Sequence, residues 1–314
     1  MAAVSLREIL GLTPLGERLR QGRLAIVGDE YSPRSRFGLS SLQILKPHWA
    51  VELWLGRQPF GRELPVYNLF NRTPTSPALG WSVRKSQVQD FRGGSLSYDS
   101  HNATDFATPP GTRLVAPAAG VVRLVVDEFH RGGKKLMLDH GAGVTTVMAH
   151  LARTVVSVGD EVAAGQVVAL SGASGINFFA AGFMDPPHLH FGTWLNGVPV
   201  DPFAMAGEVS MWDQPNAPTP LELSTALGET PWREPNAYDA ALVRLQIDAC
   251  RDPAMQARLL AVPDLAIRAC QTVFYRNYFP TRFTAEVPVS TYVAGRAAAL
   301  ALPFLREDYA SIRL

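Results

Sequence analysis

Five residues of this 314-residue chain have the types and spacing that a hydrolytic metal site requires. His101 and Asp105 stand four positions apart, His188 and His190 stand two apart, and His150 lies between the two pairs. Three of the five could bind one zinc ion and leave a fourth coordination position open, which is typical of catalytic zinc. The remaining two imidazoles would lie beside the ion. Such an arrangement could hydrolyse an amide bond.

The second pair of histidines favours an extended backbone. Residues two apart in a strand point to the same face, so a strand would direct His188 and His190 into one cavity, whereas a helix would separate them. Pro187 before the pair and Phe191-Gly192-Thr193-Trp194 after it favour the strand. The first pair requires a bend, because a straight strand would hold residues 101 and 105 roughly 13 Å apart.

The other histidines are expected to have no part in this chemistry. His140 stands in the turn-like segment 139–143, where its ring could hydrogen-bond the loop, so we expect a structural role. His48 and His130 have no motif around them and are predicted to be surface residues.

Residues 96–205 are predicted to form a β domain. Short β-branched runs with turn signals recur there roughly every 8–12 residues, the pattern of an all-β sandwich or barrel. Examples are 120–126, 135–139 and 144–148, and the turn residues 139–143 join the last two as a hairpin. We therefore expect a compact, mostly antiparallel domain.

The flanking regions differ from this middle part. Residues 1–95 begin with a helical pattern over 6–19 and continue as mixed short strands and turns, including a strand-like run at 49–55. Residues 206–314 are predicted to be a linker, up to about residue 235, followed by a helical region. The helical spacing covers 237–275 and 293–302, with prolines 253, 263 and 280 as breaks. The fold class expected is thus multidomain α+β.

The bulk composition excludes several functions. The chain is 47% hydrophobic and 18% charged with a net charge of +1, which argues against nucleic-acid binding as its main role. We find neither a signal peptide in residues 1–25 nor an apolar stretch long enough to span a membrane. Cys250 and Cys270 could form a disulfide or remain two buried thiols, and both alternatives stay open. No CxxC pair exists, so cysteine ligation of a metal is not expected.

The segment from Ser97 to Phe203, about a third of the chain, resembles the lysostaphin-type zinc metalloendopeptidases, which cut cross-links or stem peptides of bacterial peptidoglycan. The matching pieces follow the family order: His101-Asn102-Ala103-Thr104-Asp105, Ala116-Pro117-Ala118-Ala119-Gly120, Leu138-Asp139-His140-Gly141, Met148-Ala149-His150-Leu151, Val158-Gly159-Asp160-Glu161-Val162, Pro187-His188-Leu189-His190-Phe191 and Asn196-Gly197-Val198-Pro199-Val200-Asp201-Pro202.

This resemblance implies a role for each of the five residues. His101, Asp105 and His190 would bind one Zn²⁺ per chain, and His150 and His188 would be the catalytic pair beside it. The middle region would then be a barrel-like zinc metallopeptidase domain acting on peptidoglycan peptides. That substrate in turn implies the cell envelope, the periplasm or the extracellular space.

The chain departs from the family in two places. An apolar insert, residues 176–186, precedes the histidine pair and could wall the groove or dock a neighbouring domain. Gly192 replaces an acidic residue often found after the pair. Neither touches an expected ligand, so both concern substrate preference.

Two other function classes compete with the peptidase. A catalytically silent family member could bind or activate another cell-wall hydrolase, but such proteins typically lose zinc ligands. A biotinyl-lipoyl carrier domain needs an acceptor lysine, and residues 136–202 contain none.

The flanking regions could regulate the site. The N-terminal region could cover the groove as an inhibitory segment, with Asn71, Asp90 or another side chain contacting the zinc. The C-terminal helical region could bind a regulatory partner.

Overall fold

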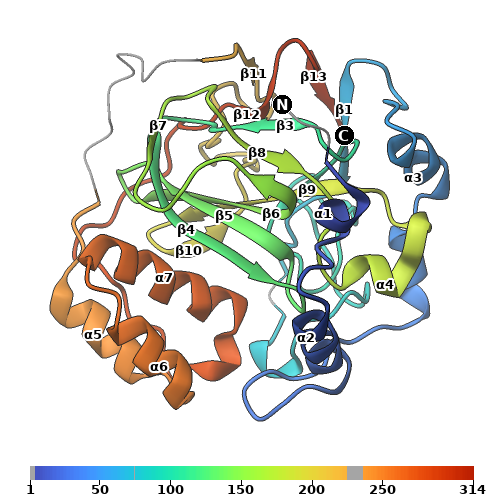
Figure 1. Ribbon diagram of the computed structural model, residues 1–314. Coiled ribbons are helices and arrows are strands. Elements are labelled where there is room, and N and C mark those ends of the chain that lie inside the picture. Colours follow the sequence, from blue (N-terminus) through green and yellow to red (C-terminus); the bar gives the residue numbers. More distant parts are fainter. Residues whose placement is uncertain (1–3, 74, 225–235) are drawn as a thin grey trace.

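The computed structural model describes residues 4–73, 75–224 and 236–314 (Figure 1). Within these ranges thirteen strands form one curled, nearly closed sheet with the main path β11-β12-β3-β8-β6-β9-β2-β1-β13. The strands are β1 (Glu63–Asn68), β2 (Thr104–Ala107), β3 (Arg113–Val115), β4 (Gly120–Glu128), β5 (Gly133–Asp139), β6 (Val144–Thr154), β7 (Glu161–Val162), β8 (Val167–Ser171), β9 (His188–Leu195), β10 (Val198–Val200), β11 (Pro220–Leu221), β12 (Leu302–Leu305) and β13 (Ser311–Arg313).

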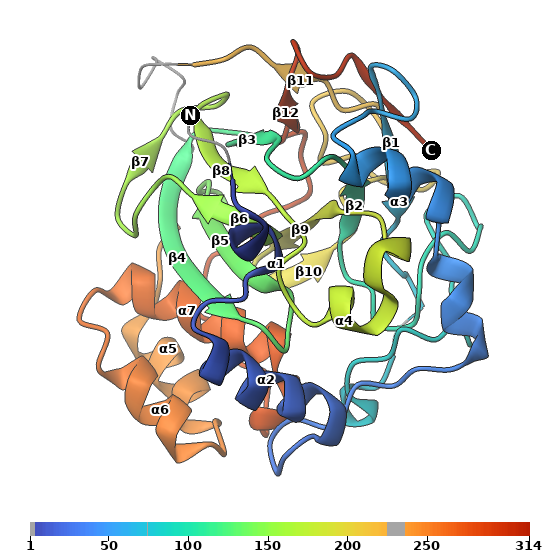
Figure 2. The same ribbon diagram turned by 45° about the vertical axis from the view of Figure 1, so that its right-hand side comes forward.

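Helices lie around this sheet, at its lower end and on its right-hand side in Figure 1; Figure 2 shows them from a second direction. They are α1 (Leu6–Leu10), α2 (Leu15–Val27), α3 (Pro47–Trp54), α4 (Asn177–Ala181), α5 (Ala240–Asp248), α6 (Pro253–Leu260) and α7 (Leu265–Tyr278), with 3-10 turns η1 (Leu39–Ile44), η2 (Pro77–Leu79), η3 (Gly182–Met184) and η4 (Pro280–Arg282).

All strand pairs within residues 96–205 are antiparallel, as predicted. The hairpin predicted at 139–143 joins β5 to β6, and Gly141 and Gly143 there adopt positive φ angles of 72° and 74°. The whole sheet is nevertheless mixed, because β1 pairs with β13 and β11 with β12 in parallel. Both parallel pairs involve strands from the flanking regions.

Side-chain alternation along β9 separates the core from the cavity. Leu189 and Phe191 are fully buried in the main core, which also contains Phe106 and Trp212. The residues that alternate with them, His188 and His190, therefore point to the opposite face. The strand predicted from the His-x-His spacing is thus formed.

The C-terminal helical region packs on the sheet as a second core. Its predicted helices over 237–275 are confirmed as α5, α6 and α7, and Pro253 occupies the first turn of α6, where a missing N–H costs nothing. Phe274 and Val273 of α7 pack with Trp194 and Met137 of the sheet. Cys250 and Cys270 are both buried free thiols, which confirms the alternative without a disulfide.

Two secondary-structure predictions were wrong. The run 49–55 lies in α3 rather than a strand: Pro47 starts the helix, and Ala50 and Leu53, three apart, are its buried face. Residues 293–302 form no helix: 293–301 are irregular and Leu302 begins β12, because N–H groups of this stretch serve other segments. Leu300 N donates to Met211 O and Ala301 N to Pro117 O, at 3.0 Å each.

The N-terminal region is more helical than predicted, because α3, η1 and η2 lie where short strands and turns were expected. It also contributes β1 to the central sheet. Strands β11, β12 and β13 come from residues 206–314, whereas part of the predicted linker, 225–235, lies outside the described residues. The boundaries at 95 and 205 stay a prediction.

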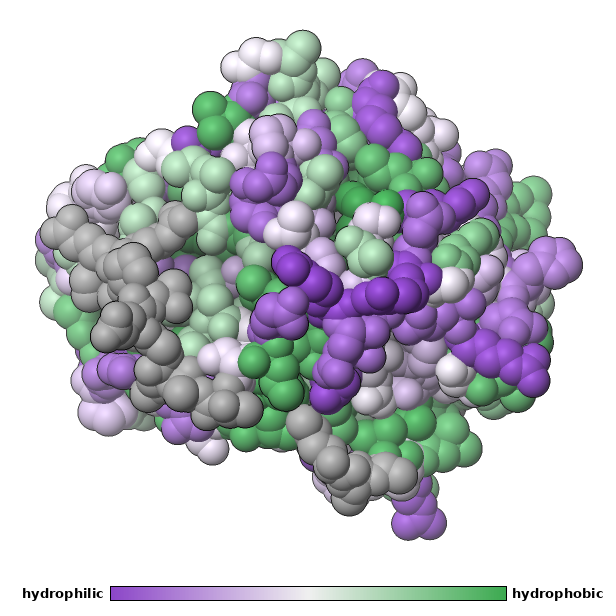
Figure 3. All heavy atoms as spheres, turned by 90° about the horizontal axis from the view of Figure 1, so that it is seen from above, coloured by the Kyte–Doolittle hydropathy of each residue, from purple (hydrophilic) through white to green (hydrophobic). Residues whose placement is uncertain are grey.

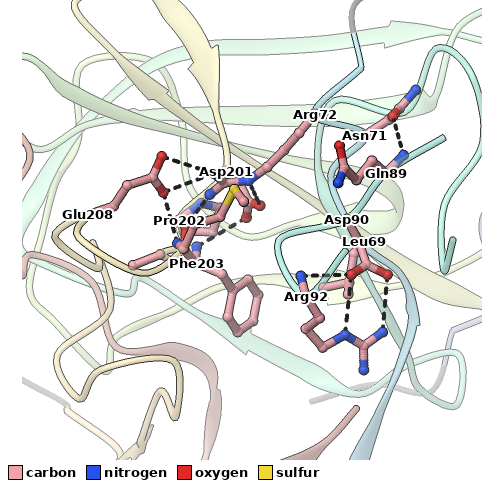
Figure 4. Close-up of polar contacts among 12 residues, drawn as sticks. Leu69, Asn71, Arg72, Gln89, Asp90, Arg92, Asp201, Pro202, Phe203 and Glu208 are labelled. Carbon is pink, nitrogen blue, oxygen red and sulfur yellow. Dashed lines mark hydrogen bonds and ion pairs between the residues drawn. The ribbon is translucent and has the colours of Figure 1, made fainter. Parts of the chain in front are cut away.

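Arg72 joins the N-terminal region to the segment after β10 (Figure 4). Its guanidinium donates to Asp201 at 2.8 Å, to Glu208 at 2.8 Å and to the Phe203 carbonyl at 2.7 Å. Burial raises the pKa of Asp201 to about 6, although Arg72 acts in the opposite direction.

At the end that carries β11 and β13, hydrophilic and hydrophobic side chains alternate on the surface (Figure 3).

Candidate active site

The five residues singled out by type and spacing come from three strands and one loop. His188 and His190 stand on β9 and Asp105 on β2, and Asp105 pairs directly opposite His190. His150 stands on β6, next to Ala149, which pairs with His190 on the other side of β9. His101 lies in the loop before β2. The chain bends at Ala103, as predicted for 101–105, so His101 Nε2 comes within 3.0 Å of Asp105 Oδ1.

His101, Asp105 and His190 form a compact group of potential metal ligands. One ligand atom from each lies within 4.8 Å of the others, and all three side chains are buried. His190 Nδ1 is 2.9 Å from the same Asp105 Oδ1 that faces His101. Imidazole nitrogen and carboxylate oxygen are the ligand types that suit zinc.

The protonation of His101 supports a cation at this point. His101 Nδ1 is 2.7 Å from the Leu69 carbonyl, which can only accept, so Nδ1 carries the proton. In the neutral ring, Nε2 is then a bare lone pair, and it has no hydrogen-bond donor among the described residues. A lone pair buried 3.0 Å from a carboxylate oxygen is unfavourable unless a cation lies between them. The residues present therefore fit a metal ion.

Asn68 holds the outer oxygen of Asp105. Its Nδ2 donates to Asp105 Oδ2 at 2.9 Å, and both side chains are buried. The other oxygen, Oδ1, is thereby turned toward His101 and His190. Groups that orient metal ligands in this way tune the affinity of a site. The sequence offered no sign of Asn68, which comes from β1 in the N-terminal region.

His150 and His188 are both held in one tautomer by backbone carbonyls. His150 Nδ1 donates to Ser174 O at 2.8 Å, and His188 Nδ1 donates to Pro186 O at 2.7 Å. Each ring therefore keeps its Nε2 outside any hydrogen bond with the described residues, and the two ring centroids are 4.8 Å apart. His188 Nε2 lies 3.8 Å from Asp105 Oδ2, so both rings face the group of three.

The electrostatics of the site favour an ionised Asp105 beside neutral His150 and His190. Burial opposes ionisation of Asp105, but the surrounding histidines outweigh it and hold its pKa well below the usual range. Burial, reinforced by His188 and His190, holds the pKa of His150 well below its usual range, and burial lowers the pKa of His190 too. Neutral His150 and His190 can offer lone pairs at neutral pH.

A cavity of about 440 Å³ opens on these residues. Asp105, His150, His188 and His190 line it on the sheet side. The opposite walls come from other parts of the chain: the N-terminal region supplies Phe37, Leu42, Tyr67 and Trp81, the insert supplies Ile176, Asn177 and Asp185, and the turn after β4 supplies His130 and Arg131.

The insert, residues 176–186, lies in the wall of the cavity, which confirms one of the two expectations for it. It forms α4 and η3, and its rings pack against α3 of the N-terminal region. Trp54 meets Phe178 and Phe183 at centroid distances of 5.7 and 5.2 Å. Asp185 accepts from Tyr67 at 2.9 Å, and burial raises the pKa of Asp185.

The two N-terminal side chains named as zinc contacts serve other purposes. Asn71 donates to the Asp99 carbonyl at 2.8 Å and accepts from Gln89 N at 3.1 Å (Figure 4). Asp90 pairs with Arg92 at 3.2 Å (Figure 4). Among the described residues, Asn68 is the N-terminal side chain that hydrogen-bonds a candidate metal ligand.

Of the predictions for the remaining three histidines, two are confirmed and one is wrong. His140 is structural, with Nδ1 3.0 Å from Ala119 O and Nε2 2.8 Å from Thr146 Oγ1, and His48 is exposed. His130 is not a surface residue: it is 9% exposed, stacks on Phe279 at 5.2 Å and lines the cavity. Phe279, the ring that covers it, lies between α7 and η4, more than a hundred residues away, so no local motif could reveal its burial.

Comparison with known proteins shows that the central domain is similar to a family of peptidases. Residues 99–202 match the sequence profile of Peptidase family M23. A Haemophilus influenzae protein described as an uncharacterized metalloprotease is 36% identical over 149 residues, 48% of this chain and 26% of its own length. Peptidoglycan DD-endopeptidase ShyB of Vibrio cholerae is 37% identical over 101 residues, 32% of this chain and 22% of its own length.

Among solved structures, the catalytic domain of lysostaphin from Staphylococcus simulans is 30% identical, with a TM-score of 0.29, covering 32% of this chain and 75% of that one. The matched segment spans about a quarter of the length of the curated relatives. The resemblance noted from the motifs is confirmed, because residues 99–202 match the model of Peptidase family M23.

The described residues contain no helix long and apolar enough to cross a membrane.

Proposed function

We propose that this chain is a zinc-dependent metalloendopeptidase that hydrolyses peptide bonds of bacterial peptidoglycan, in stem or cross-link peptides. The observation that carries the proposal is the bare, buried His101 Nε2 facing Asp105 Oδ1 at 3.0 Å, beside His190 Nδ1 on the same oxygen. His101, Asp105 and His190 would hold one Zn²⁺ per chain. The name of the Vibrio cholerae relative supports the substrate class.

Zinc, when bound, supplies a Lewis acid that lowers the pKa of water and polarises a scissile carbonyl. The chain's own part is to manage protons beside that chemistry. With Nδ1 tied to a carbonyl, His150 and His188 each have a free Nε2 able to accept a proton from the attacking water. The protonated ring can then donate to the oxyanion of the tetrahedral intermediate or to the leaving amine.

Asp105 and Asn68 prepare the site for this work. Asn68 fixes Oδ2, so Oδ1 stays directed at the two histidine ligands without reorganisation. Burial of the whole group strengthens its electrostatic interactions. The role of the N-terminal region as an inhibitor stays a prediction, as does a regulatory partner of the C-terminal helices. Action on peptidoglycan would place the protein in the cell envelope or outside the cell.

Two measurements test the proposal. Purified protein should contain about one zinc per chain by mass or absorption spectroscopy, and the zinc-loaded protein should release fragments from sacculi. A zinc-loaded protein that cuts neither sacculi of any cross-link type nor a generic peptide set would contradict it.

The alternative, a catalytically silent activator of another hydrolase, makes the opposite prediction for metal. Such an adaptor should purify without stoichiometric zinc. The retention of both free imidazole Nε2 atoms next to the group of three favours the enzyme.

A further inference from the structure

Arg131 lies on the turn between β4 and β5 and lines the same cavity as the candidate catalytic residues. The neighbouring Gly132 accepts a hydrogen bond from His150 N at 2.9 Å. Lys135, buried under the turn, donates to the carbonyls of Arg131 and Gly133. The backbone at Arg131 is therefore fixed directly to the strand that carries His150.

Two aromatic rings hold the Arg131 guanidinium in the cavity wall. Its central carbon lies 5.2 Å from the centroid of Trp81 and 5.7 Å from that of Phe279. Trp81 in turn meets Tyr98 at 6.0 Å, and Tyr98 meets His101 at 4.5 Å. The cation thus stands on an aromatic wall that leads to a candidate metal ligand.

Arg131 has no acidic partner among the described residues, although other charges around it are paired. Glu128 is nearest to Lys135, at 3.7 Å, and Arg282 pairs with Asp252 at 3.2 Å. The cavity's own carboxylates are engaged elsewhere, Asp105 by the histidines and Asp185 by Tyr67.

The surroundings of Arg131 are positively charged, and its side chain is partly buried in the cavity wall. Burial, with help from Arg282, lowers the pKa of Arg131 to about 10, so it is still a cation at neutral pH. The adjacent His130 is buried with both ring nitrogens unpaired among the described residues. A partly buried cation without a counter-ion is unfavourable, and an anion brought into the cavity would offset that cost.

We propose that Arg131 determines substrate specificity by binding a free carboxylate of the peptide whose amide bond is cut. A guanidinium presents a planar fork of donors that matches a carboxylate in a bidentate manner, and stacking on Trp81 and Phe279 holds that plane ready. The substrate class is therefore a peptide with a free carboxylate beside the scissile bond. This inference rests on the proposed peptidase function.

A purely structural role is the competing explanation, because the same cation–aromatic contacts could fasten the turn. The two explanations differ in what they predict for neutral substrates. A structural arginine would affect every peptide equally, whereas a carboxylate-binding arginine matters only when the peptide carries the carboxylate.

The test compares three peptides of one sequence that contains a side-chain carboxylate. In the first peptide both carboxylates are free, the second has a C-terminal carboxamide, and the third has a free C terminus but an amidated side chain. Wild-type enzyme should prefer the peptide with the recognised carboxylate by about tenfold or more in kcat/KM, mainly through KM. The two amidated peptides tell whether that group is terminal or on a side chain. Arg131→Gln should lower the preference to about one while still cutting the neutral peptide, and Arg131→Lys should keep part of it.

Arg282→Gln is the matched control. Arg282 also stacks on Phe279, at 4.6 Å, but does not line the cavity. It should leave the preference intact. Equal cutting of all three peptides by wild type, or an equal loss on all three in both Arg131 variants, would overturn the proposal.

A binding measurement separates this inference from the proposed function. Metal-stripped wild-type protein should bind the carboxylate peptide more tightly than its amide, seen by calorimetry or by tryptophan fluorescence, and Arg131→Gln should abolish the difference. If loaded enzyme cuts nothing but this difference persists, the proposed function fails and Arg131 still binds carboxylate. If peptides are cut with no difference in binding or rate, only the Arg131 proposal fails.

Discussion

The candidate metal group and the cavity wall opposite it are assembled in different ways. The group and the catalytic pair beside it stand on β2, β6, β9 and the bend before β2, within the matched family domain, and backbone carbonyls fix the rings of His101, His150 and His188. The wall is built from the N-terminal region, the insert and the turn at 129–132, and it is held by ring stacking. The difference suggests that chemistry resides in the sheet and that substrate choice resides in the wall.

The largest effects should come from the metal group itself. His190→Ala should abolish zinc binding and activity, because it removes a proposed ligand. His188→Ala should retain zinc but lower kcat by about 10²–10⁴, because it removes a proton acceptor. Zinc content and steady-state kinetics check both, with the exposed His48→Ala as control. Equal metal loss in the His188 and His190 variants would show that their roles are not divided as proposed.

The next largest effect should come from Gly133, where sheet and wall meet. Its φ is 61°, and an added Cβ would lie 2.3 Å from the Ser174 carbonyl oxygen, which holds His150. Gly133→Ala should destabilise the fold by roughly 3 kcal/mol or more and lower kcat. Gly182→Ala in the insert is the control, because its φ is also 61° but nothing lies near its Cβ.

Thermal unfolding and kinetics distinguish these two glycines. We expect Gly182→Ala to cost only the backbone strain, about 1 kcal/mol. Similar melting temperatures for the two variants would mean that the Ser174 contact does not constrain the turn.

A smaller effect is expected where the N-terminal region touches the metal group. Asn68→Leu should weaken zinc binding by about 10–100-fold, because Asp105 Oδ2 would lose its donor. Competition with a chelator measures the affinity. Asn177→Ala, which also lines the cavity but has no bond to Asp105, should leave it unchanged. An unaltered affinity in the Asn68 variant would argue that Asp105 is oriented by its histidines alone.

The smallest predicted effect is a pH dependence of stability in the wall. Burial, aided by Lys135 and Arg131, lowers the pKa of His130 from 6.5 to about 3. The unfolded chain therefore binds a proton at His130 more readily than the folded one between these values. This contribution to stability is complete above pH 6.5 and is lost progressively as the pH falls toward 3.

Between pH 7 and pH 5.5 the loss should be about 1 kcal/mol, at roughly 1.4 kcal/mol per pH unit below the unfolded pKa. His130→Phe keeps the stacking on Phe279 and should remove this part of the slope. Denaturant unfolding of both proteins at the two pH values measures it. Identical slopes would mean that His130 is not buried in its neutral form.

The sequence predicted the site to the extent that its features are local. His-x-His on a strand, a bend between His101 and Asp105, and the antiparallel hairpins all follow from short-range periodicity and turn residues. Asn68, His130 and Arg131 could not be found that way, because their positions depend on segments distant in the chain. The strand predicted at 49–55 failed for the same reason: only packing against β1 and the insert reveals which face of α3 is buried.

The most direct test of the central claim is a digest of defined muropeptides with protein loaded with one zinc, stripped by chelator, and reloaded. The account predicts that a peptide bond is cut only in the zinc-loaded and reloaded samples, and by neither the His190→Ala nor the His188→Ala variant. Undiminished cutting after complete removal of zinc, or by the His190→Ala variant, would contradict it.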